Sequence, residues 1–414
     1  MADLKSEDYL QKLFAERIGG SQFGKGTEIY KFEKIKRAKR QVIADFPERK
    51  LLDFGIGEND EMADVEVRAV LAAEANQLEN RGYADNGIQD YKDAAARFTW
   101  REFNVRLNSQ TEINHCIGTK TALSMIPAAF INPGDITLMT VPGYPVAGTH
   151  TRYYGGEVYR LPLLEKNNFL PDIASIPDAV LEKAKLLVLN YPNSPTGALA
   201  SEKFFENVVA FAKKHEIVVI HDAAHIMLTY DREPLSFLQI EGARDVGVEL
   251  HSMSKGFDMI GWRLGFVCGN ERIVHAFADV KDNCDSGQFM AIQKAGAVAL
   301  DNPEIPQRIR TKYQRRLRKL ISVLGSKGFN TKMSGGSYFL YVKAPTGISN
   351  GAQFANAEEC SQFLIRNRSI CTVPWDDAGA YLRFSVTYHA PDEASEDEMM
   401  RELVSRLGED TFTW

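Results

Sequence analysis

Residues 251–265 read HSMSKGFDMIGWRLG, and this stretch decides how the rest of the chain is interpreted. Lys255 follows a β-rich run and two serines, Ser252 and Ser254, and Arg263 comes shortly after it between two glycines. Strand ends in α/β proteins open onto the crevice where ligands bind. Ser252, Ser254 and Arg263 can hold a phosphate there, while the amine of Lys255 forms an imine with a carbonyl compound. A surface lysine beside a Gly-Trp-Arg turn is the alternative, which the full pattern S-x-S-K-x-F-x-x-x-G-x-R-x-G disfavours.

Outward from this stretch, short apolar runs alternate with amphipathic ones between residues 50 and 300, which predicts βα units on a mainly parallel sheet. Parallel strands are expected at Glu112–Ile117, Ile136–Val141, Leu186–Asn190, Ile217–His221 and Val248–Ser252. Helices are expected between them, for example at Thr121–Phe130 and Glu202–His215. Leu264–Gly269 follows a short connection and is therefore predicted to run antiparallel.

After residue 300 the pattern changes to a basic helix at Ile305–Leu324, strand-like SYFLYVKA and YLRFSVT, and helices near Glu358–Asn367 and Glu396–Leu407. This indicates a smaller α+β domain. We expect a large domain over residues 47–305 and a small domain formed by residues 1–46 and 306–414. The many basic residues of 28–45 are interpreted as a solvated helix face rather than as an anion site.

Composition excludes several classes of protein. The chain has 414 residues, 44% apolar and 25% charged, as ordinary globular proteins do. Its net charge of −6 argues against nucleic acid or an anionic membrane surface as a partner. No apolar run approaches the ~18 residues of a membrane span, and the charged N-terminus lacks the apolar core of a secretory signal. Five cysteines without a C-x-x-C pair indicate a reducing, cytoplasmic compartment.

Four further segments stand in a distinctive order. GTKTA at Gly118–Ala122 opens a helix whose free N–H groups favour a phosphate, and Tyr144 lies in VPGYPV. NYPNSPTG spans Asn190–Gly197, and Asp222 ends the run IVVIHD. Together with residues 251–265, these segments resemble the pyridoxal-phosphate site of fold-type-I aminotransferases. The resemblance implies an aspartate-aminotransferase-like fold with a seven-stranded, mainly parallel sheet, and pyridoxal 5'-phosphate as cofactor without a metal.

The resemblance also implies a role for each residue. Lys255 forms the internal aldimine and then moves the proton between substrate Cα and cofactor C4′, while ionised Asp222 holds the ring nitrogen protonated. Asn193 donates to the phenolate oxygen of the ring and lies beside the substrate, and Tyr144 stacks on the ring. The remaining expected cofactor contacts are Thr119, Lys120, His225, Ser252, Ser254, Arg263 and, across a dimer interface, Tyr83.

One position departs from the family pattern. The family usually has D-x-A-Y after the strand, whereas this chain has Asp222-Ala-Ala-His225. An imidazole can donate one N–H to the ring oxygen, but it titrates near neutrality. We therefore expect His225 to make the absorbance of the cofactor sensitive to pH, unless it points away as a buried core histidine.

The substrate side is likewise implied by the resemblance. Arg383, in AYLRFSVTYHA, matches the arginine that binds the substrate α-carboxylate, a pairing that fixes which Cα bond breaks. Gly57, in LLDFGIGEND, matches a backbone contact to the substrate, and Tyr30 matches an N-terminal tyrosine that contacts it.

A homodimer with two shared sites follows from the same comparison. Tyr83, in ENRGYADNGIQDY, matches a tyrosine that reaches the phosphate of the partner subunit. The segment KDNCDSGQF at residues 281–289 is expected at that interface, with Ser286 or Gln288 near the neighbouring phosphate.

Longer stretches of the sequence indicate which members of the family the chain resembles most. EIYKFEKIKRAKR, LLDFGIGEND and KDNCDSGQFMAIQKAG are similar to the LL-diaminopimelate aminotransferases, in their divergent second branch. This implies transfer of the amino group between LL-2,6-diaminopimelate and 2-oxoglutarate, in lysine and peptidoglycan precursor synthesis. An aspartate or aromatic aminotransferase of the same fold is one alternative, and β-elimination on the same cofactor is another. A catalytically silent scaffold or regulator is the non-enzymatic alternative, which the intact lysine and aspartate disfavour.

Overall fold

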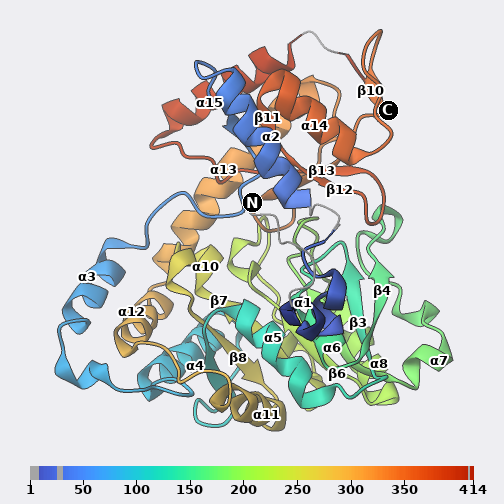
Figure 1. Cartoon of the computed structure of the whole chain (residues 1–414). Helices are drawn as coiled ribbons and strands as arrows, with labels where there is room; N and C mark the ends of the chain where they lie inside the picture. The colour runs from blue at the N-terminus through green and yellow to red at the C-terminus, as the bar shows by residue number, and fades with distance from the viewer. Residues whose placement is uncertain (1–8, 26–30, 409–410) are drawn as a thin grey trace.

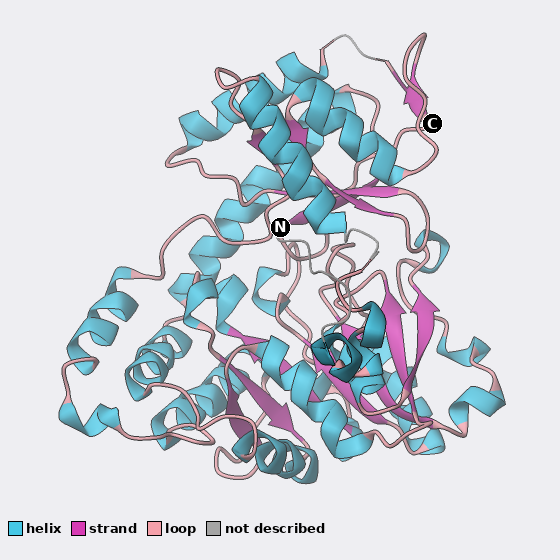
Figure 2. Ribbon diagram, in the orientation of Figure 1, coloured by secondary structure: helices cyan, strands magenta, loops and turns pink. Residues whose placement is uncertain are grey.

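A computed structural model describes residues 9–25, 31–408 and 411–414, and shows two lobes stacked one above the other (Figure 1). The lower, larger lobe is built on a seven-stranded sheet between helices, and the upper lobe holds α2, α13, α14 and α15 (Figures 1 and 2). Tyr30 lies outside the described residues, so its expected substrate contact stays a prediction.

The central sheet has the order β2-β8-β7-β6-β5-β3-β4. Its strands are β2 (Ile113–Cys116), β3 (Ile136–Val141), β4 (Glu157–Pro162), β5 (Ala184–Asn190), β6 (Val218–Asp222), β7 (Gly247–Ser252) and β8 (Gly265–Gly269). Only β8 runs against the others, because it pairs antiparallel with both β7 and β2 while the remaining pairs are parallel. The expected fold class and the antiparallel strand are confirmed.

Helices cover both faces of this sheet. One face packs on α5 (Thr119–Phe130), α6 (Val146–Tyr153) and α11 (Glu271–Asp282) around a core that includes Ile126, Val248 and Phe277. The other face packs on α4 (Gln89–Phe103), α8 (Glu202–His215) and α12 (Met290–Asp301). The inner strands β3, β5, β6, β7 and β8 are buried on both sides, and most of them consist of nearly continuous apolar runs.

Local sequence signals explain where the helices begin. In α8, the hydroxyl of Ser201 accepts from Phe204 N at 3.1 Å, which caps the first turn. Apolar side chains then recur every three or four residues and face the sheet, and the last turn carries basic residues that suit the helix dipole.

The smaller lobe surrounds a three-stranded antiparallel sheet in the order β12-β13-β9. Its helices are α2 (Lys31–Asp45), α13 (Glu304–Ser326), α14 (Ala357–Arg368) and α15 (Glu393–Leu407). Its strands are β9 (Phe339–Lys343), β12 (Val373–Trp375) and β13 (Tyr381–Ser385), with β1 (Leu52–Asp53) pairing β11 (Ile370–Cys371) and β10 (Gly347–Ile348) pairing β14 (Phe412–Thr413). Five further α-helices of the described residues belong to neither group of helices given above: α1 (Tyr9–Leu13), α3 (Val65–Glu74), α7 (Asp178–Leu181), α9 (Ala243–Val246) and α10 (Met253–Gly256).

Two contacts bear on the expected division at residue 47, which stays a prediction. Leu52 pairs with Ile370, so the chain joins the smaller lobe for a few residues past that point. Nearer the N-terminus, Arg17 Nη1 donates to the carbonyl of Tyr153 in α6 at 3.3 Å, which brings the start of the chain onto the larger lobe.

Candidate active site

The carboxyl ends of three neighbouring strands bring the predicted residues together. Asn190 ends β5, Asp222 ends β6 directly beside it in register, and Ser252 ends β7. A cavity of about 460 Å³ opens at this edge, between the lobes. It is lined from the larger lobe by Thr119, Lys120, Tyr144, Asn190, Ser194, Asp222, His225, Ser252, Ser254, Lys255, Ile260 and Arg263, and from the other side by Gly57, Tyr338, Phe339, Trp375 and Arg383.

Lys255 lines this cavity and is half-buried. Its Nζ donates to the carbonyl of Gly57 at 2.9 Å and lies 5.4 Å from the centre of the Tyr338 ring. Burial lowers the pKa of Lys255 to about 8, with Glu58 opposing this and the charges of Arg383 and Arg263 adding to it. The neutral amine, which is the nucleophilic form, is therefore accessible near neutral pH.

Asp222 lies at the base of the same cavity, only 6% exposed. Its Oδ1 accepts from Ala224 N at 3.1 Å, and its main-chain carbonyl accepts from Asn190 Nδ2 at 2.8 Å. Burial raises the pKa of Asp222 to about 6, against the lowering effects of the Ala224 N–H, His221, His251 and Lys255. A cationic partner would favour the ionised carboxylate of Asp222 at neutral pH.

A candidate anion site, around Arg263, lies beside the lysine. The guanidinium of Arg263 is fixed by hydrogen bonds from Nη1 to Ser254 Oγ at 3.4 Å and to the carbonyl of Ile260 at 2.8 Å. A Cβ at Gly118, whose φ is +75°, would come within 2.4 Å of Arg263 Nη2, so only glycine allows the guanidinium to lie here. The first N–H groups of α5 begin at Thr119, next to this guanidinium.

Two neighbouring residues of the NYPNSPTG loop, Asn193 and Ser194, differ in how they relate to the cavity. Asn193 is fully buried, its Oδ1 accepts from Thr196 N at 3.1 Å and Thr196 Oγ1 at 2.7 Å, and it is not among the side chains that line the cavity. Ser194 lines the cavity instead, with its N–H bound to Asn190 Oδ1 at 2.8 Å. Asn193 Nδ2 is buried without a hydrogen-bond partner among the described residues, so its role as a donor to the ring oxygen stays a prediction.

His225 lines the cavity, as expected, but does not titrate as expected. Its ring meets Tyr338 and Phe339 at centroid distances of 5.4 and 5.9 Å. Burial, with the positive charges of Lys255 and Arg383, lowers the pKa of His225 to about 3. The prediction that this histidine titrates near neutrality is wrong, because desolvation disfavours the imidazolium.

The smaller lobe contributes the guanidinium of Arg383 to the cavity. Arg383, on β13, stacks over the ring of Phe339 at 4.1 Å and donates from Nη2 to the carbonyl of Gly55 at 2.9 Å. Burial lowers the pKa of Arg383 to about 10, so it stays charged at neutral pH. Its Nε has no hydrogen-bond partner among the described residues, and this leaves a buried donor for a carboxylate.

Three residues that the sequence analysis did not single out complete the wall. Tyr338 donates from its hydroxyl to the carbonyl of Gly57 at 2.6 Å, which fixes the acceptor of Lys255. Phe339 and Trp375 line the side of the cavity next to Arg383. The run SYFLYVKA identified the strand, but nothing in its pattern indicated which of its aromatic rings face a ligand.

The three residues predicted at a dimer interface, Tyr83, Ser286 and Gln288, do not line the cavity of their own chain, and their contacts to a partner stay predictions. Tyr83 is 82% exposed and does not line its own cavity. Gln288 turns into its own chain, where its Nε2 donates to the carbonyls of Trp262 at 2.8 Å and Arg263 at 2.9 Å. Ser286 is exposed.

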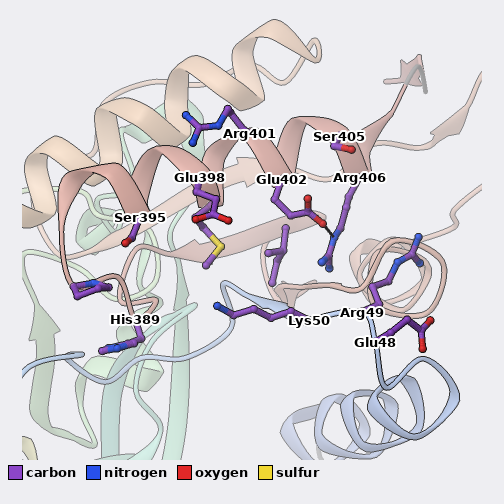
Figure 3. A pocket seen from close by; sticks show the side chains of 13 residues that line it. Glu48, Arg49, Lys50, His389, Ser395, Glu398, Arg401, Glu402, Ser405 and Arg406 are labelled. Carbon is purple, nitrogen blue, oxygen red and sulfur yellow. Dashed lines mark hydrogen bonds and ion pairs between the residues drawn. The ribbon is translucent and has the colours of Figure 1, made fainter.

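A larger cavity in the smaller lobe lacks this chemistry. It lies between residues 48–52 and α15, and its lining is a mixture of acidic and basic side chains (Figure 3). Its most buried cation, Arg406, is paired with Glu402 Oε1 at 2.7 Å and with the carbonyl of Ser369. Chemistry rather than size therefore identifies the interlobe cavity as the candidate site.

Comparisons with known proteins agree with this fold, which is that of a fold-type-I aminotransferase. The sequence model of the family "Aminotransferase class I and II" matches residues 49–407, and the chain belongs to this family. The protein is thus an aminotransferase. Within the described residues, none of the helices has the length and apolar character needed to cross a bilayer.

The relatives are similar over almost their whole length. LL-diaminopimelate aminotransferases of Methanocaldococcus jannaschii and Methanococcus maripaludis are 55% and 54% identical, over 97% and 99% of this chain and 98% and 100% of theirs. Among solved structures, substrate-bound BacF from Bacillus subtilis is 30% identical with a TM-score of 0.84, covering 96% of this chain and 98% of that one.

Proposed function

We propose that the interlobe cavity binds pyridoxal 5'-phosphate and that the protein transfers the amino group of LL-2,6-diaminopimelate to 2-oxoglutarate. One observation carries the cofactor part of the proposal: Lys255, Asp222, Arg263 and Arg383 converge on one cavity. The names of the two relatives at 54–55% identity support the substrate.

The residues present fit this cofactor. The Arg263 guanidinium, the Ser254 hydroxyl and the start of α5 form a donor set that suits a phosphate dianion. The carboxylate of Asp222 suits a protonated ring nitrogen, and the ring of Tyr144 lies at the cavity wall, where it can stack. When bound, the cofactor supplies an electron-withdrawing ring that stabilises the carbanion at the substrate Cα.

The chain's own side chains divide the remaining work. Lys255 Nζ is the nucleophile that holds the cofactor and, once freed, the base that moves the proton at the substrate Cα. Arg383 binds the substrate α-carboxylate through its unpartnered Nε and thereby orients the Cα–H bond. Asn193 keeps its assignment as donor to the ring oxygen, supported by its buried Nδ2, which has no partner among the described residues, while Ser194 and His225 line the cavity beside it.

Assembly and location belong to the same proposal. The exposed ring of Tyr83 supports a homodimer in which each subunit completes the phosphate site of the other. All five cysteines are free thiols, which supports a reducing, cytoplasmic compartment.

A panel of amino donors tests the substrate. The cofactor-loaded protein is supplied with 2-oxoglutarate and LL-diaminopimelate, meso-diaminopimelate, aspartate or phenylalanine, and glutamate formation is measured, with Lys255→Ala as the inactive control. We expect the highest kcat/KM with LL-diaminopimelate. A higher value with aspartate or phenylalanine would instead assign one of the alternative substrates.

A further inference from the structure

The side chain of Gln288 supports the turn that carries Arg263 through two hydrogen bonds. Arg263 has a φ of +57°, in the left-handed region that non-glycine residues rarely adopt. The side-chain amide of Gln288 donates to two successive carbonyls of this turn, those of Trp262 at 2.8 Å and Arg263 at 2.9 Å. Surrounding structure has to hold such a conformation, because on its own it is unfavourable for a residue with a side chain.

His115 fixes the orientation of that amide. Its Nε2 lies 2.9 Å from Gln288 Oε1, and since the amide oxygen can only accept, Nε2 carries the proton. Burial lowers the pKa of His115 to about 4, so the imidazole is neutral near neutral pH, and its Nδ1 has no partner among the described residues. A flipped amide would place its NH₂ against Nε2–H and its oxygen against two carbonyls.

The loop that carries Gln288 is itself held in place. Gln293 Nε2 donates to the carbonyl of Gln288 at 2.7 Å, and Gln293 Oε1 accepts from Ile88 N at 2.8 Å. Gly287 forms a β-bridge with Ala84, the residue after Tyr83. The loop therefore lies between the exposed segment with Tyr83 and the turn with Arg263.

We propose that Gln288 is a positioning residue that holds Arg263 toward the phosphate, with His115 orienting its amide. This rests on the proposed function, in which Arg263 binds the cofactor phosphate. The guanidinium is clamped between Gly118, Ser254 and the Ile260 carbonyl, so a small shift of its backbone would carry it out of reach of the anion.

The affinities for pyridoxal phosphate and for pyridoxal, which lacks the phosphate, separate this role from a general structural one. Gln288→Met removes the two donors at similar size, and Gln288→Ala is a second variant in case the first folds poorly. Gln293→Met is the matched control, because it loosens the same loop without touching the Arg263 turn. Binding is measured by absorbance titration of the cofactor-free dimer, with melting temperatures recorded in parallel.

We expect Gln288→Met to weaken pyridoxal phosphate about five- to tenfold, the size of one net hydrogen bond, and to leave pyridoxal unchanged. Equal weakening of both ligands, as expected of Gln293→Met, would overturn the positioning role. Arg263→Met tests the proposed phosphate role of Arg263 separately from the positioning role of Gln288. If it keeps the full preference for the phosphorylated ligand, the proposed phosphate role fails; if it loses that preference while Gln288→Met retains it, only the role of Gln288 fails.

Discussion

At the scale of single residues, Asp222 shows a conflict between stability and activity. Its carboxyl is buried, and its pKa of about 6 lies above the ordinary value of 3.8. A raised pKa means that the folded state binds the proton more tightly, so Asp222 favours folding at low pH, and this contribution is lost as pH rises through about 6. The ionised form, which the chemistry needs, therefore costs stability in the cofactor-free protein.

Asp222→Asn should accordingly stabilise the cofactor-free protein at pH 8, by roughly 1–3 kcal/mol, while abolishing nearly all turnover. The amide retains the bond from Ala224 N but cannot hold a ring nitrogen protonated. Urea unfolding at pH 8 and pH 4 checks this, with the gain expected to vanish at the lower pH. A variant that is destabilised at pH 8, or that remains active, contradicts this account of Asp222.

His225 should not contribute to the pH dependence of the bound cofactor's absorbance. Its pKa of about 3 keeps the ring neutral over the whole working range. The visible absorbance of the loaded protein, titrated between pH 5 and 9, should therefore give superimposable curves for the wild type and for His225→Gln, a neutral residue of similar reach. An ionisation near ~6.5 that only the wild type shows would mean that the cofactor restores the ordinary histidine pKa.

Residue types could be predicted from the sequence more securely than their directions. The motif spacing predicted that Lys255, Asp222, Ser254 and Arg263 share one site, and all four line the same cavity. The spacing could not tell that Ser194 also lines the cavity, because that depends on how the turn closes on Thr196. Nor could it give the desolvation of His225, which comes from rings on a strand more than a hundred residues away.

At the scale of elements, a buried acid on β7, Glu249, links this strand to β6, the strand that ends at Asp222. Glu249 is fully buried, and its carboxylate accepts from His221 Nδ1 at 2.8 Å and from His251 Nε2, Ser236 Oγ and Phe237 N at 2.7 Å each. Burial alone would raise the pKa of Glu249, but the bond from His221 and the charge of His251 outweigh it, so its pKa lies well below the usual range.

Glu249→Gln should therefore destabilise the fold by about 2–4 kcal/mol at pH 7, because an NH₂ group would face the donors that the second oxygen now accepts. A depressed pKa contributes stability above ~4.3 that is lost as pH falls, so the difference between the two proteins should shrink in acid. Denaturant unfolding measures it, with Glu206→Gln, an exposed partner of Lys203, as the control expected to stay within ~0.5 kcal/mol. An equally small effect at Glu249 would mean that the network rearranges at no cost.

The elements that the sequence did not reveal have a common physical reason. Strand β4 was not predicted, because it lies at the edge of the sheet and only one of its six residues, Leu161, is buried. An edge strand half open to solvent has no continuous apolar run to mark it. The central strands and the capped helix α8 were predictable because burial on both faces and the Ser201 cap leave clear patterns.

At the scale of the whole molecule, the two lobes are joined at the edge of the cavity. Arg316 of α13, 1% exposed on its side chain, pairs with Asp60 at 3.0 Å and with Glu396 of α15 at 2.8 Å. Asn59, the residue before this aspartate, donates to the carbonyl of Lys255 at 2.9 Å. The backbone of the candidate catalytic lysine is thus tied to the small lobe through a buried ion pair, a link between distant segments that no local pattern indicates.

The dimer is the largest-scale prediction, and mixed dimers test it directly. Tyr83 does not line its own cavity and is 82% exposed, so a contact with the phosphate of another subunit is the one tested. Lys255→Ala and Tyr83→Ala proteins, each defective at limiting cofactor, are unfolded and refolded together at equal amounts. Half of the dimers should then be mixed, each with one intact site, so about a quarter of the wild-type activity should return. A Tyr83 that acts within its own chain leaves every site with a defect, so no recovery, or a protein that is monomeric and fully active, would rule out shared sites.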